Sequence, residues 1–388
     1  MTPQQDHQLE AVSAPAEAAN KTTADKRLLS IDTLRGFDML MISGAGSFFL
    51  LLHGKTDWNW LNAFALQFEH PPWNGFTFYD FIFPLFLFIA GLSLPFSLNK
   101  GKSLGMTNRE LYIKAFKRMP ILMACGIFYK NAPVPFLEPS QIRFVSVLGR
   151  IGFAGFVATV LYLNFSFMQR IGWVAGLLLL YYAGVFLIPV PGYGSGDLSF
   201  EGNLVGWFDR TFLPGRLHQK TYDELGILTQ IPALCLTVLG SMGGDLVRRT
   251  SVTDYRKLRD LVVAGVVCLV IAAIWAQHFP INKHLWSSSF IMLTGGMAFL
   301  TFGLFYWVID ILRYRRWTFF FVVIGVNSLT IYLAYRFIDF GYTSRLLFQG
   351  LYKHTPEQWH EVFQTLGGLG LVWLFLYVLY RKKLFLKV

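Results

Sequence analysis

Charged side chains inside long apolar runs are the residues of this sequence that most need a chemical explanation. Asp32, Arg35 and Asp38 recur at three-residue spacing, so on a helix they share one face. Arg150 stands in the apolar run VLGRIGF, where a buried guanidinium needs a carboxylate, carbonyl groups or a bound anion beside it. Either these charges form local ion pairs, with Asp38 or Asp80 as partners for Arg150, or they mark a functional site.

Uncharged polar residues give a second set of candidates. His70 lies in QFEHPPWNG, and a neutral imidazole can accept a proton or attack an acyl carbon, although a single loop histidine is more often an ordinary surface residue. Asn327 and Ser328 lie in GVNSLTIY, where such side chains either bond neighbouring helices or contact a ligand. We find no nucleophile elbow, P-loop, zinc-protease motif or dinucleotide fingerprint in a suitable context. We expect no metal site, because no metal-ligand spacing is visible among the cysteines Cys125, Cys235 and Cys268.

The elements that must position these residues are long apolar runs. Apolar residues make up 54% of the chain and charged residues only 15%, whereas a soluble domain usually carries about a quarter. The runs are long enough to cross the roughly 30 Å hydrocarbon core as helices, the form that satisfies the backbone in lipid. We therefore predict an all-α polytopic membrane protein, a bundle of about ten transmembrane helices in the lipid bilayer, at residues 31–52, 79–98, 113–129, 144–163, 171–190, 225–247, 258–277, 288–309, 317–337 and 363–380.

The placement of the positive charges predicts the orientation of the bundle. The net charge is +11, and the Lys and Arg residues cluster in alternate gaps between the apolar runs, which is the positive-inside pattern rather than that of a nucleic-acid partner. It predicts that both termini are cytoplasmic. Residues 1–25 are polar and lack the apolar core of a signal peptide, so we expect a disordered cytoplasmic tail before a transmembrane domain at 26–388. Two long loops, 53–78 and 191–224, fall on the opposite side and are long enough to carry function.

An ordered set of motifs, spread over nearly the whole chain, carries a resemblance to a known family. The stretches are RLLSIDTLRGFDM at 27–39, FEHPPWNGFTFYDFIFPLFLFIAGLSLPFSL at 68–98, GYGSGDLSFEGNLVGWFDRTFLP at 192–214, DELGILTQIPALCLTVLG at 223–240, PINKHLWSSSF at 280–290, GVNSLTIY at 325–332 and YRKKLFLKV at 380–388. Together they resemble the transmembrane acetyltransferases typified by heparan-α-glucosaminide N-acetyltransferase. The resemblance extends to bacterial DUF5009 proteins, some of which are described as transporters related to N-acetylglucosamine.

The resemblance implies transfer of acetyl from cytosolic acetyl-CoA to an amino sugar of the glucosamine type on the periplasmic side of a bacterial inner membrane. The catalytic histidine of the family lies in an H-x-x-W-N-G motif and corresponds to His70 in HPPWNG. One departure is Gly46, which stands where the animal enzymes carry an asparagine, so the identity of the acceptor sugar stays open. Dimers are common in the family, and a homodimer is one expectation.

With that family in view, we assign expected roles to individual residues. His70 would take the proton of the sugar amine directly, or would first accept the acetyl group itself. Asn74 and the amides of the 71–75 turn would stabilise the oxyanion, and Asp80 would orient the imidazole. We expect the acetyl-CoA-binding residues to be Asp32, Arg35, Arg150, Asn327 and Ser328, with the nucleotide near Arg35 and the basic clusters.

The alternative function is transport of N-acetylglucosamine or a related amino sugar. A transporter needs a site near the midplane of the membrane, and such sites are often built from broken helices. Gly44 and Gly46 in the first span, and Gly243–Gly244 in the sixth, are the positions that could break a helix. They could equally be close-packing positions between helices.

Overall fold

The computed structural model describes residues 28–386, and the regular structure within that range is helical throughout, which confirms the predicted all-α fold. The predicted tail at residues 1–25 lies outside the described residues. The elements are α2 (Leu29–Leu40), η1 (Met41–Ala45), α3 (Gly46–Leu50), α4 (Asn59–Leu66), α5 (Phe78–Leu92), α6 (Leu94–Ser103), α7 (Asn108–Asn131), η2 (Pro139–Gln141), α8 (Val147–Asn164), α9 (Phe167–Leu187), α10 (Leu204–Phe212), α11 (Gln230–Arg248), α12 (Asp254–Trp275), α13 (Ser288–Tyr306), η3 (Trp307–Ile311), α14 (Thr318–Gly325), α15 (Ser328–Ala334), α16 (Phe340–Tyr352), η4 (Glu357–Trp359) and α17 (His360–Arg381).

Each of the ten predicted spans coincides with a helix or with consecutive helices. Within the described range, seven continuous helical segments are long and apolar enough to cross a membrane: Phe78–Ser103, Val147–Asn164, Phe167–Leu187, Gln230–Arg248, Asp254–Trp275, Ser288–Ile311 and Glu357–Arg381. The other three predicted spans correspond to α2–α3, to α7 and to α14–α15. The first and third of these are interrupted, and α7 carries several Lys and Arg residues. The chain is therefore a multi-pass membrane protein, and the count of ten stays a prediction.

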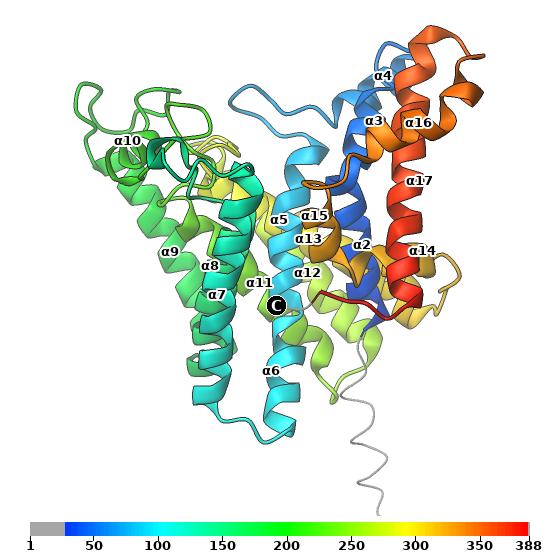
Figure 1. Cartoon of the computed structure of the whole chain (residues 1–388). Helices are drawn as coiled ribbons and strands as arrows, with labels where there is room; N and C mark the ends of the chain where they lie inside the picture. Colours follow the sequence, from blue (N-terminus) through cyan, green and yellow to red (C-terminus); the bar gives the residue numbers. More distant parts are fainter. Residues whose placement is uncertain (1–27, 387–388) are drawn as a thin grey trace, which may run out of the picture.

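The bundle has two unlike ends (Figure 1). The short helices α4, α10 and α16 and the longest connecting segments lie at one end, which we call the long-loop end. Helix α6 and the short α6–α7 connection lie at the other, which we call the α6 end. Helix α2 begins, and α17 ends, toward the α6 end. The predicted loop at 53–78 is thus not entirely loop, since it contains α4.

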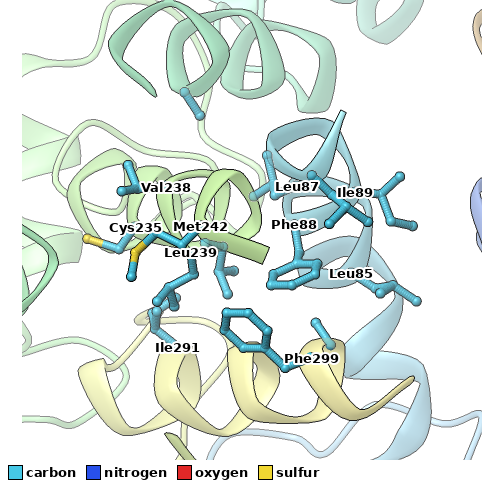
Figure 2. Close-up of a cluster of buried hydrophobic side chains, with 14 of the residues drawn as sticks. Leu85, Leu87, Phe88, Ile89, Cys235, Val238, Leu239, Met242, Ile291 and Phe299 are labelled. Atoms are coloured by element: carbon cyan, nitrogen blue, oxygen red, sulfur yellow. The ribbon is translucent and has the colours of Figure 1, made fainter. Parts of the chain in front are cut away.

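The core of the bundle lies where α5, α11 and α13 meet (Figure 2). Phe88 of α5 packs edge-on against Phe299 of α13 at 4.9 Å between ring centroids. Leu239 of α11 and Ile291 of α13 are buried in the same cluster. Helix α11 is buried along nearly its whole length, so it is the central helix of the bundle, surrounded by other helices.

Glycines bring α5 and α11 into backbone contact. A Cβ atom on Gly91 would lie 1.9 Å from the Thr237 carbonyl oxygen, and one on Gly240 would lie 2.0 Å from that of Phe88. Neither approach leaves room for a methyl group. Small residues that let two backbones meet are the usual packing device in membranes, where apolar burial alone does not drive helices together.

The outer helices expose apolar side chains in rows. Helix α12 presents one such row, Val263, Val266, Val267, Val270 and Ile274, and α9 exposes Leu179 and Leu180. Contiguous apolar surface of this extent marks an interaction surface rather than a water-facing one. The surface suits contact with lipid tails, in agreement with the multi-pass assignment.

Two of the helical spans are broken, and a third position where a break was one of two alternatives is unbroken. In the first span, Gly44 has φ +115°, a conformation that glycine adopts without a Cβ penalty, and the chain turns through the π-helical segment η1. Helices α14 and α15 are separated at Val326–Asn327. At Gly243–Gly244, where the sequence left a helix break and close packing both open, the structure shows close packing: α11 runs without interruption past both glycines, which pack against Leu92 and Phe299.

Candidate active site

The start of α5 places a carboxylate at the long-loop end. Asp80 stands at the third position of a capping box, where its Oδ2 accepts the backbone N–H of Thr77 at 3.1 Å and the Thr77 hydroxyl at 3.3 Å. Such a capping box is the local reason that the helix begins here. Because one carboxylate oxygen is held by the cap, the other, Oδ1, is free to face the preceding turn.

His70 faces that second oxygen. Its Nδ1 lies 2.6 Å from Asp80 Oδ1, and its ring stacks on Tyr79 with centroids 5.1 Å apart. The carboxylate favours the tautomer with the proton on Nδ1, which leaves Nε2 with a lone pair. The side chain is 43% exposed, whereas that of Asp80 is 1% exposed. A fixed imidazole with an accessible lone pair can act as a base or as a nucleophile.

Lys283, which the sequence did not mark as functional, completes this cluster. Its Nζ lies 3.1 Å from His70 Nε2, 3.2 Å from His70 Nδ1 and 3.3 Å from Asp80 Oδ1. The ammonium group is thus a third ionic partner of the pair. It is also a cation beside His70 Nε2, where it can stabilise negative charge.

Asn74 and the turn around it are tied to the loop that carries Lys283. Asn74 Oδ1 accepts from Asn282 Nδ2 at 3.0 Å, and Gly75 N donates to Ile281 O at 3.0 Å. The amide nitrogen of Asn74 therefore keeps its hydrogens for another acceptor, as its predicted oxyanion role requires.

A second histidine–carboxylate pair lies on the other side of the same turn. His284 Nδ1 lies 3.1 Å from Glu224 Oε1 and 2.8 Å from the Tyr222 hydroxyl, and its Nε2 lies 3.4 Å from the Pro71 carbonyl oxygen. Its ring stacks on Trp73 at 5.3 Å with an interplanar angle of 9°.

This pair holds a strongly acidic carboxyl. Burial alone would raise the pKa of Glu224, but its hydrogen bond with His284 and the charge of Lys283 outweigh burial and lower that pKa to about 2. Sequence reasoning missed His284 and Glu224, because no motif connects positions 60 residues apart. The one available signal was that both fall in the stretches that carry the family resemblance.

Arg150 has other partners than those predicted. It lies in the first turn of α8, and the structure pairs it with neither Asp38 nor Asp80. One guanidinium nitrogen donates to the Glu224 carbonyl oxygen at 2.9 Å and to the Thr229 hydroxyl. The guanidinium also lies 4.3 Å from the centroid of the Trp286 ring. These contacts fix the segment that carries Glu224, so Arg150 supports the site from behind.

The charged face of the first span contains the expected ion pair between Asp32 and Arg35, but Asp38 takes no part in it. Arg35 lies 3.3 Å from Asp32 Oδ1 and donates to the Ser93 hydroxyl at 2.7 Å. Together with Lys100, these residues line a cavity of about 310 Å³ at the α6 end. Asp38 is fully buried, and its carboxylate has no hydrogen-bond partner among the described residues.

Cavities continue from this end of the bundle toward the other. Ser97 lines both the Arg35 cavity and a second one of about 100 Å³, and Arg118 and Ile151 line both the second cavity and a third of about 180 Å³. The third, largely apolar cavity is also lined by Ser328 and Tyr332.

Of the two predicted polar contacts in the ninth span, Ser328 lines the third cavity, and Asn327 lines none of the cavities described above. The Asn327 side chain is buried, and neither of its amide atoms has a partner among the described residues. Separately, no group of three or more His, Cys, Asp or Glu side chains in residues 28–386 is arranged to hold a metal ion.

The fold and this geometry define a polytopic α-helical membrane protein with a histidine–carboxylate–lysine cluster at one end of the bundle. A family model described as a domain of unknown function, DUF5009, matches residues 27–169, which include His70 and Asp80 but not Lys283. Mouse (Mus musculus) heparan-alpha-glucosaminide N-acetyltransferase is 27% identical over 435 residues, covering 97% of this chain and 63% of the relative.

The human (Homo sapiens) protein of the same name is 27% identical over 416 residues, covering 93% of this chain and 60% of that protein. The chain therefore spans about three fifths of the length of these curated relatives. The comparisons confirm the resemblance predicted from the sequence: this chain is similar, over most of its length, to membrane proteins of the heparan-α-glucosaminide N-acetyltransferase type.

Proposed function

We propose that this protein transfers an acetyl group from acetyl-CoA to the amino group of a glucosamine-type sugar. The observation that carries the proposal is the His70–Asp80 pair, in which a buried carboxylate holds one imidazole nitrogen at 2.6 Å while the ring stays accessible. The similarity to two N-acetyltransferases supports the same reaction class.

The series of cavities supports a route for the acetyl donor. The cations Arg35 and Lys100 at the α6 end suit the phosphates of the nucleotide. The apolar cavity with Ser328 suits the uncharged arm that carries the thioester. Tyr79, Phe83 and Phe86 lie on one face of α5, and about 10 Å of helix separates Tyr79, which stacks on His70, from Phe86, which lines this cavity.

The reaction needs one proton acceptor and one stabilised oxyanion. In a direct transfer, the neutral amine attacks the thioester carbon and a C–N bond forms as the C–S bond breaks. His70 Nε2 takes the amine proton, and the thiolate of CoA leaves. In the two-step route, Nε2 itself attacks the thioester carbon, the C–S bond breaks and the thiolate of CoA leaves. The amine then attacks the acetyl-imidazole, the bond to Nε2 breaks, and the released Nε2 takes the amine proton. In both routes, Lys283 and the Asn74 amide face the developing negative charge.

In the orientation that the charge pattern predicts, the α6 end is cytoplasmic and the long-loop end faces the periplasm of a bacterial inner membrane. The donor would then enter from the cytoplasm, and the acceptor from the opposite side. The protein would thus move the acetyl group, but not the sugar, across the bilayer.

Transport of an amino sugar is the second candidate function. The observation that favours it is the pair of interrupted spans, at Gly44 and at Val326–Asn327, because transporter sites are often built at broken helices. A transporter releases its solute unchanged, whereas the proposed enzyme consumes acetyl-CoA in proportion to product.

The test uses purified protein with labelled acetyl-CoA and glucosamine. We expect labelled N-acetylglucosamine from the wild type, none above background from His70→Ala, and wild-type rates from His53→Ala, which removes an exposed histidine near the same end. Label on the wild-type protein before the sugar is added would select the two-step route. Absence of acetylated product, together with uptake of unmodified sugar into proteoliposomes, would replace the enzyme by the transporter.

A further inference from the structure

A second polar cavity at the long-loop end takes no part in the proposed chemistry. It has a volume of about 400 Å³ and lies between the end of α7, the segment before Tyr222 and the end of α15. Four side chains with full positive charges, one histidine and two tyrosines line it, and no carboxylate does: Tyr129, Lys130, Arg143, Arg216, His218, Tyr335 and Arg336. We call this cavity the basic pocket.

One of its four cations is already neutralised. Arg143 is buried and makes two hydrogen bonds to the Asp223 carboxylate, at 2.6 and 2.7 Å. Lys130, Arg216 and Arg336 have no ion pair with any residue in the described part of the chain. Three like charges therefore converge on one cavity without an ion-pair partner, an arrangement that a bound anion would stabilise.

We propose that the basic pocket binds the phosphate group of a phosphorylated ligand. Guanidinium groups present paired N–H donors that match phosphate oxygens, and an ammonium group and tyrosine hydroxyls add single donors. A phosphate monoester carries up to two negative charges at neutral pH, which a pocket with three uncompensated cations can balance. A carboxylate carries one charge on two oxygens and would leave more of these donors without partners.

Two chains of contacts connect the basic pocket with His70. On one side, the Tyr335 hydroxyl donates to the Ser43 carbonyl oxygen, and the same first span packs Gly46 against Tyr79, on which His70 stacks. The pocket and His70 therefore belong to the same end of the bundle.

On the other side, Arg143 binds Asp223, whose neighbour Glu224 pairs with His284 beside the 71–75 turn. If the proposed acetyl transfer holds, on which this step rests, the phosphorylated ligand is the acceptor, an amino sugar that carries a phosphate. The alternative source of the same chemistry is the headgroup of an anionic lipid.

Binding is measured first, without any need for turnover. Calorimetry on the purified full-length protein in neutral detergent uses glucosamine 6-phosphate, inorganic phosphate and glucosamine as separate probes. The test variant is Arg216→Gln with Arg336→Gln, because both side chains are exposed and their loss should not disturb folding. The matched control is Arg345→Gln, an exposed arginine of α16 that does not line the pocket.

We expect glucosamine 6-phosphate to bind the wild type and Arg345→Gln alike. In the double variant its affinity should fall about tenfold or more, the cost of losing charge-assisted hydrogen bonds. Glucosamine should bind all three proteins equally at this pocket, if at all. A second arm compares nanodiscs of phosphatidylcholine with nanodiscs that also contain phosphatidylglycerol. Displacement of the sugar phosphate by phosphatidylglycerol would make the lipid headgroup the source of the phosphate.

Equal affinity of the double variant and the wild type for every phosphate probe, in detergent and in nanodiscs, would overturn the proposal. A separate assay follows acetyl transfer to glucosamine 6-phosphate. Loss of phosphate binding in the double variant, without acetyl transfer by any protein to glucosamine 6-phosphate or to glucosamine, would keep the basic pocket and remove the proposed enzyme. Transfer by all three proteins with the same apparent KM would keep the enzyme and remove the pocket from acceptor binding.

Discussion

The long-loop end carries two histidine–carboxylate pairs, and the surroundings of the two pairs differ. His70 pairs with Asp80, and its side chain is 43% exposed over a carboxylate that is 1% exposed. His284 pairs with Glu224, and there the exposures are 11% for the histidine and 24% for the carboxylate. In the first pair, water and substrate can reach the imidazole. In the second, the imidazole is covered by Trp73 and Tyr222.

The difference lies in what occupies the second ring nitrogen. His284 has oxygen neighbours at both nitrogens, one of them the carbonyl of Pro71, so it fastens the turn that follows His70. The Nδ1 atom of His70 faces Asp80, and its Nε2 atom faces the Lys283 ammonium group. Contact between a histidine and an acid therefore does not by itself indicate catalysis; the role proposed for His70 depends on its accessible second nitrogen.

The largest expected effect separates the two histidines by activity. His70→Ala should lower acetyl transfer by about 10²- to 10⁴-fold, the contribution of a positioned base, while its melting temperature stays near that of the wild type because the side chain is half exposed. The measurement is product formation from labelled acetyl-CoA beside a thermal unfolding curve. Retention of more than a tenth of wild-type activity would show that His70 does not have the proposed catalytic role, and the two pairs would then not differ in function.

The next effect tests whether Asp80 acts through the imidazole. Asp80→Asn keeps an oxygen for the Thr77 N–H and so keeps the helix cap, but it removes the charge that holds the His70 ring. We expect kcat to fall about 10- to 100-fold, with its pH profile displaced, and KM for the sugar to stay nearly constant. The control is Glu110→Gln, which changes the acid of a similar capping box formed with Thr107 at the start of α7. This variant should leave kcat unchanged.

The second pair should respond in stability. His284→Ala removes the stacking on Trp73 and leaves the Glu224 carboxylate without its histidine, so unfolding should become easier by about 1–3 kcal/mol. Thermal unfolding in detergent measures the loss, and activity at a temperature well below the transition should change far less than in His70→Ala. A fully stable His284→Ala protein without activity would instead make His284 a second catalytic group.

The smallest effect is a pH dependence of stability at the second pair. Because the pKa of Glu224 is lowered to about 2 from an ordinary value of 4.5, its ionised form stabilises the fold above pH 4.5, and that contribution is lost as the pH falls from 4.5 toward 2. The stability difference between the wild type and Glu224→Gln should therefore shrink over this interval. A difference that stays constant from pH 6 to pH 3 would show that the carboxylate charge is not what stabilises this region.

The fold was largely accessible from the sequence because lipid imposes simple rules. Each predicted apolar run coincides with a helix or with consecutive helices, including α7, where several basic residues interrupt the run. Breaks within helices were harder to predict, since a glycine serves equally as a kink or as a packing position. Gly44 adopts a positive φ, whereas Gly243 lies in an unbroken helix against Phe299.

Only part of the candidate site could be predicted from the sequence, and the reason is different. His70 and Asp80 are ten residues apart and joined by one turn and a helix cap, so their contact follows from local structure. Lys283 and His284 reach the same turn from more than 200 residues away, and that pairing is set by how α13 docks on α5. The predicted partners of Arg150 were wrong for the same reason, because its actual partners, Glu224 and Thr229, are brought to it only by tertiary packing.

The glycine contacts between α5 and α11 make the geometry at His70 sensitive to mutations far from it. Asp80 and Gly91 belong to one helix, eleven residues or about 16 Å apart along its axis. A methyl group at Gly91 would meet the Thr237 carbonyl at 1.9 Å and force the two helices apart. The displacement would travel along α5 to the carboxylate at its other end. A Gly91→Ala substitution would thus lower activity although every residue of the His70 cluster is unchanged.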